Sequence, residues 1–299
     1  MSWHDRWFQY FIILFLALIW GSSFILMKIG LRSFTSLQAA GIRILLASLA
    51  LLPYSIKSLK SLKKKDVKYL LVAGFFGSFI PALLFMKAET RIDSALAGIL
   101  NSLTPVFTLL IGLTFLNIKS RWQQILGLFL GFLGALGIVT SGRDISIDNI
   151  NGYALFILAA TICYAININT VKTYLTHLRG VQITSLSFIF IGPAAFILLL
   201  TTDFEPVLRS ENWMWHFFAL AILGIVGTAF AMLIMNSLIR YTSAVFASSV
   251  TYIIPLWAIF WGMLDHESIT WLNLIFMIII LFGVYLINRR YGQSSDPKP

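Results

Sequence analysis

The sequence predicts an all-α membrane protein of ten transmembrane helices, arranged as two inverted five-helix repeats with both termini in the cytoplasm. Three observations predict it: the composition, the distribution of charge and an internal repeat. The chain is 59% hydrophobic and only 11% charged, whereas soluble domains carry about 25% charged residues. Apolar runs of roughly 20 residues recur, each long enough to cross a hydrocarbon layer of about 30 Å. Because lipid offers the backbone no hydrogen-bond partners, each run should be a helix.

The expected helices follow one another with short connections, none of which could hold a soluble domain. Alternating apolar and polar residues, which would indicate a strand barrel, are not seen. The first apolar run is too long for a signal-peptide core and lacks a small-residue cleavage site, so we expect it to remain as the first helix. In chain order the expected helices are residues 8–29, 34–54, 67–87, 94–115, 121–140, 151–171, 181–201, 213–235, 243–264 and 270–288.

The positive charges are divided unevenly between the loops on the two sides. If the N-terminus is cytoplasmic, fifteen of the 22 Lys and Arg residues fall in cytoplasmic segments, four fall outside and three lie within helices. This asymmetry is the positive-inside rule, and it predicts a multi-pass protein of the cell (inner) membrane with both termini in the cytoplasm. The formal charge of +10 therefore indicates topology rather than nucleic-acid binding. Attraction of the basic 57–68 loop to anionic lipid headgroups stays open as an alternative.

The two halves of the chain repeat each other in the same order. Gly74 and Gly77 fall on Gly224 and Gly227, Lys28 falls on Lys172, and Pro105 falls on Pro255. Because the repeat has an odd number of helices, the second copy should enter the membrane from the opposite side. Inverted repeats of this kind are typical of secondary transporters, with the substrate site near the midplane between the halves. The expected units are residues 1–145 and 146–290, followed by a polar cytoplasmic tail, 291–299.

Several stretches resemble a known family. They are "WGSSFILMK" (20–28), "RILLASLALLP" (43–53), "SALAGILNSLTPVFTLLIG" (94–112), "SAVFASSVTYIIPLWAIFWG" (243–262) and "DHESITWLNLIFMIIILFGVYLI" (265–287). The chain resembles the drug/metabolite transporter superfamily, in its EamA-like branch. The resemblance implies a ten-helix, two-repeat transporter that moves small metabolites, often amino acids or other polar or aromatic compounds, by alternating access. The chain departs from the family at two positions. Asn117 stands where the family often has an acid, although Glu267 keeps that acid in the second half. Tyr164 stands where the family often has Trp.

Polar and aromatic residues in four of the expected helices are candidates for a substrate cavity. Some share one helical face, at spacings of three or four residues. Proline removes a backbone N–H and clashes with the preceding turn, so prolines inside helices indicate breaks or hinges. The alternative, that these side chains only tie helices together, stays open. The candidates are Trp20, Ser23, Tyr164 and Asn167 in the first and sixth helices, Asn101, Thr104, Ser248 and Tyr252 in the fourth and ninth, and the hinge residues Pro105 and Pro255.

Arg43 is the ninth cavity candidate. It lies about nine residues into the second expected helix, roughly 14 Å deep at 1.5 Å per residue. Such a charge costs at least about 2.5 kcal/mol unless it is satisfied, and no acid is expected at its depth. Its expected partner is therefore a backbone carbonyl freed at Pro105 or Pro255, a hydroxyl, water or a negative group of the substrate. Snorkelling toward an interface is the remaining alternative.

We expect a secondary transporter of small metabolites, such as amino acids or related polar or aromatic compounds, working by export or exchange. A transporter of organic anions or lipid-linked cargo that uses Arg43 is the alternative, and a channel or an intramembrane enzyme ranks below both. The four His residues fall at loops or helix ends and Cys163 is the only cysteine, so we expect no catalytic residue, metal site or cofactor. No Asp or Glu is expected near the midplane, which favours facilitated transport or exchange over proton coupling. The expected partners are a small-molecule substrate and the lipid bilayer, not nucleic acid, and a homodimer stays open.

The orientation can be checked by proteolysis of oriented membrane vesicles. We expect trypsin to cut the Lys-rich 57–68 loop only when the cytoplasmic face is exposed, because positively charged loops are retained on that side. Arg209, on the opposite side, provides the internal control. Cleavage of the 57–68 loop from the outer face would contradict the topology.

Overall fold

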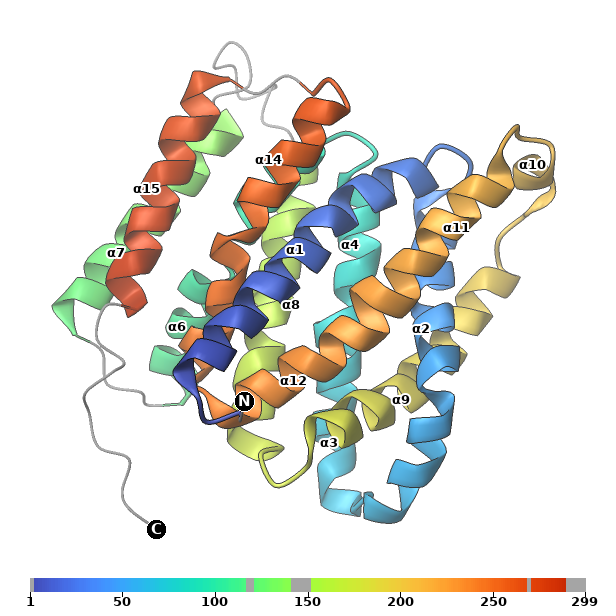
Figure 1. Cartoon of the computed structure of the whole chain (residues 1–299), viewed down its shortest axis with the longest axis horizontal. Coiled ribbons are helices and arrows are strands. Elements are labelled where there is room, and N and C mark those ends of the chain that lie inside the picture. Colours follow the sequence, from blue (N-terminus) through green and yellow to red (C-terminus); the bar gives the residue numbers. More distant parts are fainter. Residues whose placement is uncertain (1–2, 117–120, 141–151, 268–269, 289–299) are drawn as a thin grey trace.

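The computed structural model describes residues 3–116, 121–140, 152–267 and 270–288. Over these residues the chain is helical throughout and contains no strand. Figure 1 shows the helices packed side by side as one bundle. The first part of the chain contributes α1 (Arg6–Gly30), α2 (Ser36–Ser58), α3 (Lys64–Gly74), α4 (Ile80–Ala88), α5 (Ser94–Asn101), α6 (Thr104–Phe115) and α7 (Trp122–Thr140). The second part contributes α8 (Tyr153–Tyr174), α9 (Gly180–Leu200), α10 (Glu205–Leu208), α11 (Trp213–Gly224), α12 (Ala231–Tyr241), α13 (Ala244–Ser248), α14 (Ile254–Leu264) and α15 (Trp271–Asn288).

Eight helical segments of the described chain are long and apolar enough to cross a membrane, which makes this a multi-pass membrane protein. Several of them join consecutive helices, so that α3 with α4 and α11 with α12 each form one span. Two shorter apolar helices, Trp122–Gly134 and Trp271–Gly283, lie where the remaining expected spans fall. The eight spans are Arg6–Gly30, Ser36–Ser61, Lys64–Ala88, Ser94–Phe115, Tyr153–Tyr174, Gly180–Leu200, Trp213–Tyr241 and Ala244–Leu264.

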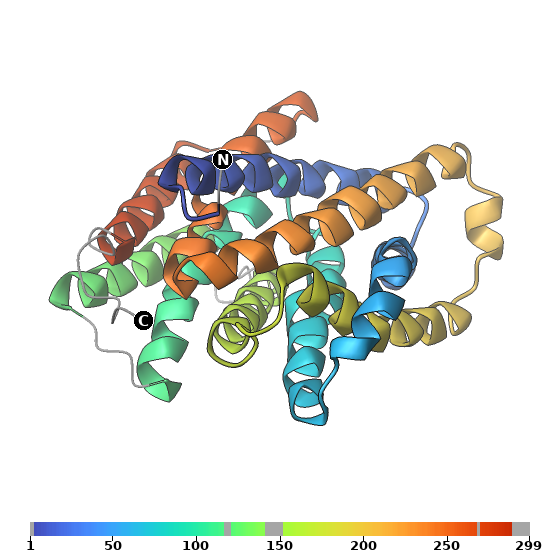
Figure 2. The same ribbon diagram turned by 60° about the horizontal axis from the view of Figure 1, so that its bottom comes forward.

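Two helix pairs mark opposite sides of the molecule (Figures 1 and 2). Helices α7 and α15 lie together on one side, and α2 and α9 lie together on the other. Between them α1, α8 and α14 occupy the middle of the bundle, and α1 also packs against α11. This arrangement brings helices from both ends of the sequence to a common centre.

Besides the 3₁₀-helix Leu59–Ser61 (η1) at the end of the second span, four places interrupt the regular α-helix in the interior of the described spans. Two are π-helices, Phe75–Phe79 (η2) between α3 and α4 and Ile225–Phe230 (η4) between α11 and α12. The other two are the step between α5 and α6 at residues 102–103 and the 3₁₀-helix Ser249–Tyr252 (η5) between α13 and α14. In the last two cases a proline opens the next helix, where its missing N–H has no intrahelical partner to lose. The expected continuous helix 94–115 is therefore broken just before Pro105, and the expected helix 243–264 is broken just before Pro255.

The side chains of Thr104 and Thr251 bridge the two proline breaks. The Thr104 hydroxyl donates to the Asn101 carbonyl at 2.8 Å, and the Thr251 hydroxyl donates to the Ser248 carbonyl at 2.9 Å. The Asn101 carbonyl is the one that the missing N–H of Pro105 leaves without its i+4 donor, and the Ser248 carbonyl lies where α13 passes into η5. Irregular backbone at membrane depth is tolerated when the protein supplies hydrogen-bond partners for its polar groups in this way.

Glycines let α7 and α15 approach closely. A Cβ atom on Gly283 would lie 2.6 Å from the carbonyl oxygen of Gly127 and 2.9 Å from the backbone nitrogen of Gly131. Because both neighbours are backbone atoms, the two helices would have to move apart to admit a methyl group. Small residues at such interfaces are how membrane helices gain packing contacts.

We therefore expect Gly283→Ala to destabilise the protein by on the order of 1–3 kcal/mol, the usual cost of overpacking. Alanine is the better helix former by about 1 kcal/mol, so any loss comes from packing. Thermal unfolding of the purified protein in detergent measures it, with Gly152→Ala as control, since a Cβ there meets nothing within 4 Å. Equal midpoints for the two variants would contradict the close approach.

Candidate functional site

A cavity lies at the centre of the bundle, between helices from both parts of the chain. Water-sized molecules can occupy about 80 Å³ of it, which is room for roughly six waters. All four interruptions of regular helix reach its wall: Gly77 and Ser78 of η2, Gly227 and Thr228 of η4, Asn101 and Thr104 beside the α5–α6 step, and Val250 and Thr251 of η5. Helices α1, α2, α4, α8, α12 and α14 supply the rest.

The cavity brings together seven of the nine residues that the sequence indicated for it. These are Trp20, Ser23, Arg43, Asn101, Thr104, Tyr164 and Asn167. They come from α1, α2, α5, α6 and α8. Residues from segments far apart in the sequence therefore share one central space.

Ser248 and Tyr252 do not line this cavity, contrary to the expectation. Ser248 is fully buried and donates its hydroxyl to the Val245 carbonyl at 2.9 Å, while Tyr252 packs partly buried against the hydrophobic core. With Pro105 aligned on Pro255, the counterparts of Asn101 and Thr104 are Thr251 and Ile254, whereas Ser248 and Tyr252 fall on other faces. Val250, Thr251 and Ile254 line the cavity in their place.

Apolar side chains that the sequence analysis did not single out cover much of the cavity wall. They are Phe24 and Met27 of α1, Phe85 of α4, Ile168 of α8, Met232 and Met235 of α12, and Ile254 of α14. Each reads in the sequence as one more apolar residue of a lipid-crossing helix, so no sequence signal separates it from its neighbours.

Arg43 is the only formally charged side chain among the described residues that line the cavity. It is 8% exposed, and its Nε donates to the Thr228 hydroxyl at 2.7 Å. Its Nη1 points at the sulfur of Met27 at 3.7 Å, which is a weak acceptor. The structural partner is thus a hydroxyl in π-helix η4, not a carbonyl freed at either proline.

The guanidinium of Arg43, which lines the cavity, has hydrogen-bond donors that no described residue uses. It carries five N–H donors, and the two contacts with Thr228 and Met27 occupy only part of them. No carboxylate of the described residues lies within ion-pair distance of it. A positive group held in a fixed position, with donors to spare, can bind an anion.

Three buried acceptors on the cavity wall have no hydrogen-bond partner among the described residues. They are the hydroxyl of Ser78 and the side-chain carbonyl oxygens of Asn101 and Asn167. Buried polar atoms are rarely left without a partner, and those that are call for water or a ligand. The cavity therefore offers both a donor group, at Arg43, and a set of neutral acceptors.

Trp20 ties α1 to the π-helix η4. Its indole Nε1 donates to the Gly227 carbonyl at 2.9 Å. A π-helix leaves carbonyls out of the regular ladder, and this bond satisfies one of them. The indole ring is thereby held at the cavity wall.

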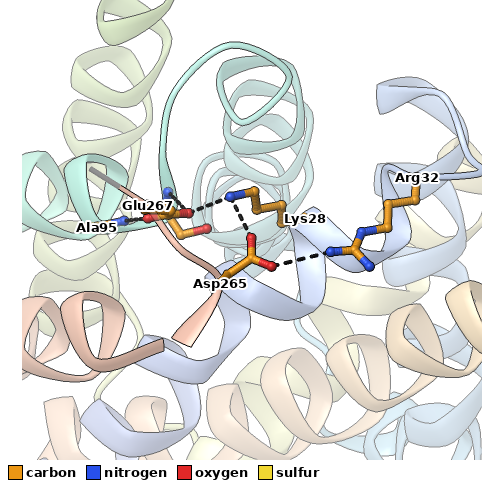
Figure 3. Close-up of polar contacts among 6 residues, drawn as sticks. Lys28, Arg32, Ala95, Asp265 and Glu267 are labelled. Carbon is orange, nitrogen blue, oxygen red and sulfur yellow. Dashed lines mark hydrogen bonds and ion pairs between the residues drawn. The ribbon is translucent and has the colours of Figure 1, made fainter. Parts of the chain in front are cut away.

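A cluster of four charged residues, Lys28, Arg32, Asp265 and Glu267, joins the end of α1 to the end of α14 (Figure 3). The Lys28 Nζ lies 2.7 Å from Asp265 Oδ2 and 2.8 Å from Glu267 Oε1. Arg32 adds a longer contact to Asp265, at 3.3 Å. We call this cluster the α1–α14 charge cluster and the side of the molecule where it lies the Lys28 end.

Glu267 also caps the N-terminus of α5. Its two carboxylate oxygens accept from the backbone N–H groups of Ser94, at 2.9 Å, and Ala95, at 3.0 Å. Its side chain is 1% exposed, and the positive end of a helix favours a carboxylate there. Asp93, the residue before α5, makes no side-chain cap. Burial, and next the nearby charge of Glu267, raise the pKa of Asp93 above its usual value.

The backbone between α14 and Glu267 turns so that the Glu267 carboxylate reaches the N-terminus of α5. His266 has a φ of 59°, in the left-handed region that non-glycine residues seldom occupy. The backbone N–H of Glu267 then donates to the Gly262 carbonyl at 2.9 Å, and the Glu267 Oε2 comes to within 2.5 Å of where a Cβ on Gly262 would stand. A residue larger than glycine at 262 would displace the carboxylate.

The opposite end of the bundle carries different contacts. The Lys172 Nζ donates to the Arg240 carbonyl at 3.5 Å, and the His177 Nε2 lies 3.1 Å from Asp66 Oδ2. Asn117, the predicted counterpart of Glu267, lies outside the described residues. Over those residues, no group of three or more His, Cys, Asp and Glu side chains is arranged to hold a metal ion.

Comparison with known proteins decides the family. The model of the EamA-like transporter family matches residues 7–140 and again 151–289. The chain belongs to the EamA-like transporter family. Membership in this family makes the chain a membrane transporter, as the resemblance implied.

Curated relatives of this EamA-like transporter match it along nearly the whole chain. An uncharacterized inner membrane transporter, YedA of Escherichia coli K12, is 26% identical, covering 91% of this chain and 88% of its own. Uncharacterized transporters of Archaeoglobus fulgidus and Bacillus subtilis (YoaV) are 25% and 24% identical, covering 91% and 95% of this chain and 95% and 97% of their own. A solved crystal structure at 15% identity shares the fold, with a TM-score of 0.64 over 94% of this chain and 98% of the other.

We expect Glu267→Gln to destabilise the folded transporter more than Asp265→Asn does. The glutamine loses the charge that attracts both Lys28 and the N-terminus of α5, and it can accept through only one oxygen. The expected cost is on the order of 2 kcal/mol, because hydrogen bonds to charged groups contribute about 1.5–3 kcal/mol each. Thermal unfolding in detergent at low and high salt measures both. A larger loss for Asp265→Asn would show that the more exposed acid is the important one.

Proposed function

We propose that this EamA-like transporter is a secondary carrier of small metabolites that bear a carboxylate, amino acids in the first place. It would export or exchange them by alternating access around the central cavity. The observation that carries this proposal is the pairing, in one cavity, of an uncompensated guanidinium with buried neutral acceptors.

The proposed architecture is ten transmembrane helices in two inverted halves, residues 1–145 and 146–290, with both termini and the 291–299 tail in the cytoplasm. Two observations support it. The family model matches the chain twice, once in each half. The π-helices η2 and η4 occupy corresponding places, where a Cβ on Gly77 would meet the amide of Asn167 and one on Gly227 would meet the hydroxyl of Ser23.

The guanidinium of Arg43 is the proposed site for the substrate carboxylate. Its planar fork matches a carboxylate in a bidentate way, and Thr228 fixes its Nε edge, leaving the outer N–H groups directed elsewhere. A bound carboxylate would supply the negative partner that the buried charge lacks. Binding then lowers the cost of holding that charge within the membrane.

The unpartnered oxygens of Ser78, Asn101 and Asn167 are the proposed site for the substrate ammonium group. A primary ammonium carries three donors and no acceptor, so three neutral acceptors suit it. Aromatic and Met side chains on the same wall accept an apolar side chain of varied shape. The small volume of the cavity favours a small metabolite over lipid-linked cargo.

Alternating access requires that one end of the cavity be closed while the other opens. The α1–α14 charge cluster joins helices from the two proposed halves at the Lys28 end, which the distribution of positive charge assigns to the outer face. We therefore propose that the cluster holds the outer end of the cavity closed. Its contacts would break when the carrier opens outward.

The test is uptake of radiolabelled amino acids and organic anions into proteoliposomes that contain the purified protein. For the transported compound we expect Arg43→Gln to lower flux at limiting substrate by about ten- to a hundredfold. This corresponds to losing a charge-assisted bond of about 1.5–3 kcal/mol. Asn101→Ala should lower it less, because one neutral acceptor is lost.

The matched control is Thr114→Ala, which removes an exposed hydroxyl from the same helix as Thr104 but away from the cavity. It should leave flux unchanged. Full flux of a carboxylate substrate in well-folded Arg43→Gln protein would exclude the proposed binding role of Arg43.

A further inference from the structure

Glu89 is a buried carboxylate that no contact in the structure satisfies. It follows the last residue of the span Lys64–Ala88 and forms the C-cap of α4. The residue is 7% exposed, and neither carboxylate oxygen has a hydrogen-bond partner among the described residues. The other buried unpartnered side-chain atoms belong to Ser and Asn, so among them Glu89 alone can change its charge.

Glu89 lies between the α1–α14 charge cluster and the cavity. One turn before it, Phe85 lines the cavity. The charges that act on it are Glu267 and Lys28, from the cluster, and Arg43, from the cavity. Tyr164 of α8, the helix packed along α4, stacks on Phe85 with 6.0 Å between the ring centroids.

Neither of the two cations that act on Glu89 is paired with it in this arrangement. Lys28 is paired with Asp265 and Glu267, and Arg43 contacts Thr228 and Met27 at the cavity. A carboxylate buried without a partner is strongly disfavoured, and such a group takes up a proton instead. Burial raises the pKa of Glu89 well above its usual value; Glu267 raises it further, while Lys28 and Arg43 lower it.

We infer that Glu89 is a proton-binding site that controls the Lys28 end of the transporter: it is protonated while the α1–α14 charge cluster is closed and loses its proton when that end opens. Opening admits water to the carboxyl, which removes the desolvation that keeps it neutral. The proton passes to water on that side, and the ionised carboxylate then competes with Glu267 for Lys28. A second acid sharing one ammonium weakens the contact that closes the end.

The direction of the pH dependence follows from this linkage. The closed state has the higher pKa and binds the proton more tightly than the open state. Protonation therefore favours closure fully below the pKa of the solvated carboxyl, and the preference is lost as pH rises through the pKa of the buried one. Raising the pH should open the Lys28 end.

Protonation of Glu89 can be observed without any substrate. This inference therefore rests on the proposed transport function only where it concerns the opening and closing of the carrier. Infrared spectra of the full-length protein in lipid nanodiscs, recorded during a pH titration, report the C=O band of a neutral carboxyl group. We expect such a band to persist at neutral pH in the wild type and in Asp93→Asn, and to be missing from Glu89→Gln. The control Glu205→Gln, which removes an exposed carboxyl, should leave the band in place.

Two further variants test the position of Glu89 among its charges. Lys28→Met removes a nearby cation and should raise the pH at which the Glu89 band disappears. Glu267→Gln removes a nearby anion and frees Lys28, and should lower it, each by about one pH unit. The amide bands in the same spectra establish that each variant is folded.

Superimposable neutral-carboxyl bands in wild type and Glu89→Gln at neutral pH would overturn the inference. So would titration of the Glu89 band at the same pH in all three charge backgrounds. In proteoliposomes, Glu89→Gln should flatten the pH profile of flux that the wild type displays. If the Glu89 band changes with pH but the protein transports none of the amino acids, the proton site is supported and the proposed substrate class is refuted.

Discussion

The hydrocarbon of the membrane requires every backbone N–H and carbonyl within it to find a partner inside the protein, and the rest of this structure depends on that constraint. In the interior of the described spans, the continuous α-helix that meets this need is interrupted at η2, η4, the α5–α6 step and η5. All four interruptions border the same cavity. The places where the backbone departs from the α-helix are thus the places where the molecule keeps polar groups facing a shared interior.

The same constraint governs the charged side chains. Lys28, Asp265 and Glu267 lie together at one end of the bundle, where Glu267 also satisfies two backbone N–H groups of α5. Arg43 lies within the bundle and has a hydroxyl and a sulfur as partners. The cluster is internally compensated, whereas Arg43 has no acidic partner among the described residues.

Sequence reasoning predicted the helical membrane fold and most polar residues of the cavity, because hydropathy and helical spacing depend on local residues. It indicated Ser248 and Tyr252, whereas Thr251 and Ile254 of the same segment line the cavity, and it did not foresee either π-helix. It gave Glu89 no role. Its burial comes from the packing of distant helices, which periodicity along one segment does not report.

The polar groups of the cavity differ between the two proposed repeats. In the proposed repeat Ser78 corresponds to Thr228, yet Thr228 is engaged by Arg43 while the Ser78 hydroxyl has no partner in the described structure. Arg43 and Thr228 thus belong to α2 and η4, and Ser78 and Asn167, whose oxygens have no partner among the described residues, belong to η2 and α8. If the proposed dipolar substrate bridged these groups, its binding energy would depend on their separation. Such a dependence is what lets a ligand shift the balance between two arrangements of the halves.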